Sequence, residues 1–212
     1  EAARDLATKA AERAFDRDLI ASEGACPPLV ALCRRGATDV TRGAAAAALG
    51  NLAANAFIRK RTLPAAGAVD ALLALCRNPC DDGDGARSAC TALRNMAFDS
   101  ETKATIAEAG CVEVACALLR AGATQARSGP YALQAAALLG TLCWGSAASK
   151  KQAVSLKAVA PLTKLVAAFA TDEAAATAAA FALRHVAADG ATRGAAAATD
   201  VVAVLSRCAR SD

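Results

Sequence analysis

The 212-residue sequence has few aromatic residues, a single histidine and no long apolar run. Phe, Trp and Tyr make up 3% of the chain, and β-branched, strand-like runs are nearly absent, which disfavours a β-sheet core. The longest apolar run, residues 174–183, is shorter than the roughly 20 residues that cross a bilayer, so we expect no transmembrane segment. One histidine leaves little room for a Cys-His or Ser-His-Asp arrangement. We therefore expect neither an enzyme nor a cofactor.

Alanine is abundant, and it is the best helix former. The composition therefore predicts an all-α protein. The net charge of +4 is mild and spread along the chain, so it neither requires nor excludes an acidic partner. Short basic clusters at residues 34–35, 59–61 and 150–151 are typical of solvated helix ends, and we expect no nucleic-acid binding.

A five-residue motif, found at the end of each alanine-rich apolar stretch, recurs along the chain at a nearly fixed interval. The copies are residues 49–53, 93–97, 139–143 and 183–187, with a fainter copy at 4–7. Counted from Asp5, Asn51, Asn95, Thr141 and His185, the steps are 46, 44, 46 and 44 residues. A period in the forties is typical of a helical solenoid, in which each unit packs on its neighbours.

A second apolar motif divides each unit into three helices. A glycine precedes the second helix in three units, at Gly24, Gly67 and Gly110, where a sharp turn needs positive φ. Lys157 and Thr199 stand at the equivalent positions of the last two units, which leaves the angle between the helices there open.

These motifs carry a resemblance to a known family. The pattern Gly-Ala-x-Pro-x-Leu-Val-x-Leu at residues 24–32 and the pattern Ala-Leu-x-Asn-Leu-Ala at 48–53 resemble armadillo repeats of the beta-catenin type. The resemblance implies a single right-handed superhelical solenoid over residues 1–212, with three helices per repeat. Its units would be the tail of a preceding repeat (1–10), four repeats (11–54, 55–99, 100–145 and 146–189) and a truncated repeat (190–212).

Nine cysteines raise the question of a metal site or a reactive thiol. The repeat alignment places Cys33, Cys76 and Cys208 at one position, which Leu119 and Val166 occupy in the other units. Cysteine thus replaces small apolar core residues, as buried free cysteine does. The spacings do not match a zinc site, and the acidic stretch 81–85 lacks the later residues of a calcium loop. We expect no metal.

The resemblance also implies a binding surface, a concave groove lined by the third helices. In the family, asparagines on that face pair with the backbone of an extended peptide, and Asn51 and Asn95 match this ladder. Thr141 and His185 occupy the next rungs. The same side chains could instead brace neighbouring third helices. An array of Trp residues four positions earlier, which marks nuclear-import adaptors, is absent here, so that function is disfavoured.

Further residues are expected on the same face. They are Arg87, Ser88, Thr91, Arg94, Gln134, Trp144, Phe181 and Arg184. Carboxylates are scarce among them, and arginine donates in a fork that suits carboxylate and phosphate, so we expect an extended acidic or phosphorylated protein segment as the partner.

The sequence therefore predicts a non-catalytic protein-interaction scaffold in the cytoplasm, with the nucleus as the alternative. A second hypothesis is a structural building block that packs into a larger assembly by its ends or convex face. Both ends of the chain are incomplete repeats with apolar side chains such as Val201 and Leu205, so end-to-end self-association is also expected.

Overall fold

The computed structural model describes residues 2–12, 14–36, 38–79, 83–124, 131–169 and 173–188, and the regular structure of these residues is entirely helical. The chain forms two compact units, Glu1–Cys111 and Val112–Asp212, which are described separately. The truncated repeat at 190–212 and its expected role in self-association lie outside the described residues. Among the helices that the structure describes, none combines the length and the apolar character needed to cross a membrane.

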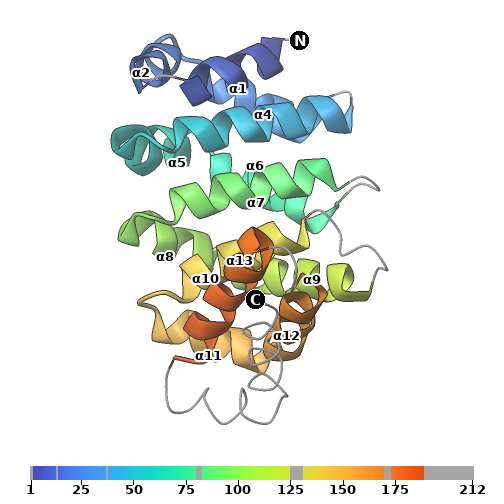
Figure 1. The fold of residues 1–212 in the computed structure, drawn as a ribbon. Coiled ribbons are helices and arrows are strands. Elements are labelled where there is room, and N and C mark those ends of the chain that lie inside the picture. The colour runs from blue at the N-terminus through green and yellow to red at the C-terminus, as the bar shows by residue number, and fades with distance from the viewer. Residues whose placement is uncertain are drawn as a thin grey trace. The chain divides into compact units, whose positions relative to one another are not determined.

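The first unit follows the predicted order of three helices per repeat (Figure 1). Its elements are α1 (Ala2–Glu12), α2 (Ala14–Ser22), α3 (Cys26–Arg35), α4 (Asp39–Leu52), the π-helical turn η1 (Ile58–Thr62), α5 (Leu63–Ala65), α6 (Ala68–Arg77), α7 (Asp84–Met96) and α8 (Ser100–Glu108). The third helices of successive repeats, α1, α4 and α7, lie side by side. Together η1 and α5 form the first helix of the repeat at 55–99.

The second unit repeats this order. After α9 (Cys111–Thr124), which begins at the last residue of the first unit, come α10 (Ala132–Cys143), α11 (Ala147–Ser155), α12 (Val159–Ala168) and α13 (Glu173–Val186). The third helices α10 and α13 pack against each other, and α12 packs on α13.

Left-handed residues turn the chain from the first helix of each repeat into the second. Gly24, Gly67 and Gly110 have φ of 77°, 75° and 89°. Lys157 adopts the same conformation, with φ of 58°, although it carries a side chain. The turn geometry is therefore kept in the repeat that lacks the glycine. A left-handed non-glycine residue costs roughly 1–2 kcal/mol, so surrounding packing determines the turn there.

The repeated endings form the core. Leu49, Leu52, Leu93, Leu139 and Leu142 are all fully buried. Short side chains let the third helices approach closely: a Cβ added at Gly50 would lie 3.2 Å from Cα of Ala92, and one at Gly43 would lie 3.5 Å from Cα of Gly85. The alanines and glycines of these helices thus take the place of the large side chains that separate helices in other folds.

The cysteines of the described residues are all buried and free. Burial raises the pKa of Cys33, Cys116 and Cys143 to about 12, so these thiols stay protonated at neutral pH. Sγ of Cys76 lies 3.7 Å from Sγ of Cys90, within the core. A protonated, buried thiol is a poor nucleophile and a poor metal ligand, which favours the predicted structural role. Cys80 and Cys208 lie outside the described residues.

Arginines at the ends of the second helices brace adjacent repeats, a role that the sequence did not indicate. Arg34 donates to the carbonyl of Gly67 at 3.1 Å, and Arg77 donates to that of Ala109 at 3.1 Å. In the second unit, Arg120 donates to the carbonyl of Leu156 at 2.9 Å. Each acceptor lies at the turn between the first and second helices of the next repeat. Arg34 is thus more than a solvated helix end.

Candidate functional site

The two ladder asparagines brace neighbouring third helices. Nδ2 of Asn51 donates to the carbonyl of Ala7 at 2.9 Å, and Nδ2 of Asn95 donates to the carbonyl of Gly50 at 2.9 Å. The carbonyl of Gly50 belongs to the last turn of α4, where carbonyls lack a partner in the helix. Backbone N–H groups satisfy the neighbouring carbonyls of Leu49, Asn51 and Leu52. Asn95 therefore supplies the donor that the last turn of α4 needs.

We expect the substitution Asn95→Ala to lower the free energy of unfolding by about 1–3 kcal/mol, because it leaves the Gly50 carbonyl without this partner. Urea denaturation measures the change. Asn78→Ala is the matched control, because the Asn78 amide bonds only its own helix at an exposed site. A loss for Asn95→Ala that is no larger than the loss for Asn78→Ala would contradict the role as a brace.

The brace also corrects the register of the first helix. Asn95 bonds the residue that precedes Asn51, and Asn51 makes the same bond to Ala7. The equivalent of Asn51 in α1 is therefore Thr8, and not Asp5 as the faint sequence copy indicated. Thr8 donates its hydroxyl to the carbonyl of Arg4, four residues earlier.

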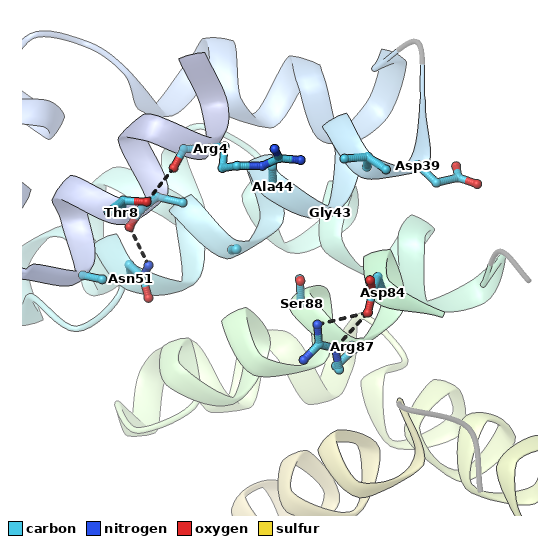
Figure 2. A pocket seen from close by; sticks show the side chains of 13 residues that line it. Arg4, Thr8, Asp39, Gly43, Ala44, Asn51, Asp84, Arg87 and Ser88 are labelled. Atoms are coloured by element: carbon cyan, nitrogen blue, oxygen red, sulfur yellow. Dashed lines mark hydrogen bonds and ion pairs between the residues drawn. The ribbon is translucent and has the colours of Figure 1, made fainter. Parts of the chain in front are cut away.

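Three successive third helices line a cavity of about 480 Å³ in the first unit (Figure 2). Alanine residues and Gly43 form its floor, and its rim is polar. The lining residues are Arg4, Ala7, Thr8 and Ala11 of α1, Asp39, Val40, Gly43, Ala44, Ala47 and Asn51 of α4, and Asp84, Arg87 and Ser88 of α7. The cavity forms because α4 carries the smallest side chains of the three helices at this level.

The rim of this cavity carries both signs of charge, contrary to the expectation that carboxylates would be scarce. Asp84 and Arg87 form an ion pair across one turn of α7, with Arg87 Nη2 3.0 Å from Asp84 Oδ1. Asp39 pairs in the same way with Arg42 on α4. Arg87 thus has its charge balanced locally. Arg4, on the opposite wall, forms no ion pair with any residue that the structure describes.

Comparison with solved structures identifies the fold. A designed armadillo repeat protein matches 97% of this chain and 83% of its own length, with a TM-score of 0.80 and 24% identity. The chain has the armadillo-repeat fold. A crystal structure of an engineered protein is also similar, at 30% identity and a TM-score of 0.84 over 99% of this chain and 82% of that one. No family model and no curated protein matches the sequence.

A further similar structure has a ligand. It is a designed armadillo repeat protein in complex with the peptide (KR)4, with 22% identity and a TM-score of 0.80 over 97% of this chain and 83% of that one. The fold class predicted from the sequence, all-α armadillo repeats of three helices, is confirmed by these comparisons.

In the armadillo repeats of the second unit, the structure differs from the sequence expectation at one rung. Thr141 is 3% exposed, and its hydroxyl donates to the carbonyl of Ala137 at 3.0 Å. A buried hydroxyl that bonds its own helix presents no group to a groove. Threonine is shorter than asparagine, so it satisfies the nearest carbonyl instead of reaching a neighbouring helix.

Four predicted site residues of the second unit do come together. The rings of Phe181 and His185 meet edge to face with centroids 4.4 Å apart, and the rings of Trp144 and His185 are 6.4 Å apart. Cζ of Arg184 lies 5.6 Å from the centroid of Phe181, and its Nη2 is 3.0 Å from Nε2 of His185. A guanidinium can only donate, so Nε2 of His185 is the acceptor of this contact. Trp144 is 52% exposed.

The remaining predicted residues lie outside the cavity of the first unit. Thr91 and Arg94 are half-buried on α7, and Gln134 is half-buried on α10. Thr91 donates its hydroxyl to the carbonyl of Arg87 at 3.1 Å.

Sequence reasoning missed several residues of the cavity, among them Arg4, Thr8 and Asp39. Arg4 and Thr8 were missed because the faint copy in α1 was aligned three residues away. The correct register is visible in the hydrogen bonds that Asn51 and Asn95 make to the preceding third helix.

Proposed function

We propose that the chain is a non-catalytic scaffold that binds an extended protein segment along the third helices of the first unit. The observation that carries this proposal is the cavity of about 480 Å³ that α1, α4 and α7 line together. A surface shared by three repeats suits an extended ligand, because such a ligand contacts each repeat in turn. The fold supports this use, since a similar designed protein is described in complex with a peptide.

The groups around the cavity suit a peptide backbone. Nδ2 of Asn51 donates to the carbonyl of Ala7, and its Oδ1, which bonds no residue that the structure describes, can accept from a ligand N–H. Ser88 of α7 points into the cavity and offers a hydroxyl that both donates and accepts (Figure 2). The floor of Ala44, Ala47 and Gly43 lets a ligand approach the helix closely. Asn51 can therefore fill both roles that the sequence left open: its Nδ2 bonds the neighbouring third helix, and its Oδ1 pairs with the peptide backbone.

Filling the cavity tests the proposal. Peptides selected on the 212-residue chain from a display library of random twelve-residue sequences are measured against the variant Ala47→Trp. We expect binding to fall at least tenfold, because an indole in the middle of the floor occupies the space of the ligand. Isothermal titration gives the affinities, and thermal melts show that the variant remains folded.

The control is Ala31→Trp, which adds the same side chain to an exposed position of α3 outside the cavity. Equal affinity in the wild-type chain and Ala47→Trp would place the binding surface elsewhere. Selected peptides that lose affinity only in Ala31→Trp would place the binding surface on α3.

The aromatic cluster of Trp144, Phe181, Arg184 and His185 is the second surface with a composition suited to protein contacts, since Trp and Arg are enriched among residues that dominate binding energy. We propose it as the contact surface of the second unit.

A further inference from the structure

We infer that Arg4 selects a glutamate side chain in the bound segment, and that the cavity over α4 receives it. This inference rests on the proposed function, because it assigns the chemistry of one side-chain position in the same groove.

The cations around the cavity differ in their pairing. Arg87 is bound by Asp84 through two contacts, with Nε at 3.1 Å and Nη2 at 3.0 Å from the same carboxylate oxygen. Arg42 is bound by Asp39. Arg4 is exposed and has no carboxylate partner within the described part of the chain, and neighbouring Asp5 forms no ion pair with it. Of these cations, Arg4 is therefore the one whose charge a ligand can balance.

The position of Arg4 fits a side chain with an apolar stem and an anionic end. Figure 2 shows Arg4 extending from α1 toward Ala44 and Asp39 of α4, above the floor of the cavity. The methylene groups of a glutamate would lie over Ala44 and Ala47, and its carboxylate would meet the guanidinium at the wall. A carboxylate accepts two parallel N–H bonds from arginine, which makes the contact directional.

The balance of charge favours a carboxylate over a phosphate group. Asp39 and Asp84 are already paired with arginines on the rim, so only the guanidinium of Arg4, which forms no ion pair with a described residue, can neutralise a ligand charge, and it neutralises one. A phosphoserine carries about −1.5 to −2 charges at neutral pH, so it would leave excess negative charge beside these two aspartates. The general expectation of an acidic or phosphorylated partner is thereby narrowed to glutamate at one position.

A charge exchange tests this assignment. The same random twelve-residue library is selected separately on the wild-type chain, on Arg4→Glu and on Arg35→Glu. Arg35 is exposed at the end of α3 and outside the cavity, so its reversal changes the net charge equally. We expect glutamate at one aligned position in peptides from the wild-type chain and from Arg35→Glu, and lysine at that position in peptides from Arg4→Glu.

Affinities of a selected peptide complete the test. Replacing its glutamate by glutamine should weaken binding to the wild-type chain roughly twofold to fivefold, the range for an exposed ion pair. The same replacement should have no effect on Arg4→Gln. A glutamate preference that persists in Arg4→Gln would overturn the role of Arg4, and so would tighter binding of a phosphoserine peptide than of the glutamate peptide.

The variant Ala47→Trp separates the two proposals. If it abolishes binding while Arg4→Gln leaves the preference for glutamate unchanged, the groove stands and the assignment of Arg4 is wrong. If Ala47→Trp leaves the affinity of the selected peptides unchanged, the groove itself is not the site.

Discussion

Replacement of Leu93 by alanine is expected to lower the free energy of unfolding by about 2–5 kcal/mol. Leu93 is fully buried in α7, and α7 packs against α4 and α6. Truncation removes apolar contacts and leaves a cavity that the backbones of closely packed helices cannot collapse to fill. Because each repeat buries its apolar face only against its neighbours, the loss is expected to destabilise adjacent repeats as well.

Urea denaturation followed by circular dichroism measures this change. Leu19→Ala removes the same atoms from a side chain that is 50% exposed on α2, and it should stay within about 0.5 kcal/mol of the wild type. If Leu93→Ala costs less than about 1 kcal/mol, Leu93 does not occupy the core position that the structure assigns to it.

The second large effect is expected for Gly140→Val, which should cost about 3 kcal/mol or more, at the upper end of the range for overpacked sites. A Cβ at Gly140 would lie 2.7 Å from Cδ1 of Phe181 and 2.9 Å from Cα of Ala182. The phenyl ring can rotate away, but Cα of Ala182 belongs to the backbone of α13. The helices α10 and α13 must therefore separate, which weakens the packing along their whole contact.

Gly85→Ala is the matched control for this effect. Gly85 also lies within a third helix, yet a Cβ there would meet no atom within 4 Å. Alanine has the higher helix propensity, by up to about 1 kcal/mol, so this variant should be as stable as the wild type or more stable. Thermal melts of both variants measure these changes in stability. Similar stability of Gly140→Val and wild type would mean that α10 and α13 do not approach as closely as the structure shows.

The burial of the cysteines shows why much of the fold could be predicted from the sequence. Aligning Cys33 and Cys76 with leucine and valine in other repeats predicted that both are core residues, and both are buried. A repeat protein presents several copies of each position, so the average character of a position is visible in one sequence. The same comparison could not predict that Sγ of Cys76 contacts Sγ of Cys90, because that contact depends on how α6 meets α7.

The candidate site was harder to predict from the sequence than the fold. Asn51 was predicted to pair with a bound peptide; in the structure it lines the cavity, and its Nδ2 donates to the carbonyl of Ala7. Arg87 was predicted to attract an acidic partner, and the structure pairs it with Asp84 one turn away. Arg4 was not predicted at all. For Asn51 and Arg87, the sequence indicated which face of the helix the residue occupies and left open which group its side chain bonds.

The sequence alone determined the repeat period, the three helices of each repeat, the left-handed turn at Gly67 and the apolar character of the core. These features follow from local dihedral preferences and from the period of the apolar residues, which are written along the chain. Only the tertiary structure decided that Thr8 is the counterpart of Asn51, that Gly140 meets Ala182, and that Arg4 forms no ion pair with the part of the chain that the structure describes. These depend on the axial offset between neighbouring helices, which is set by the packing of whole helix surfaces and by no single local pattern.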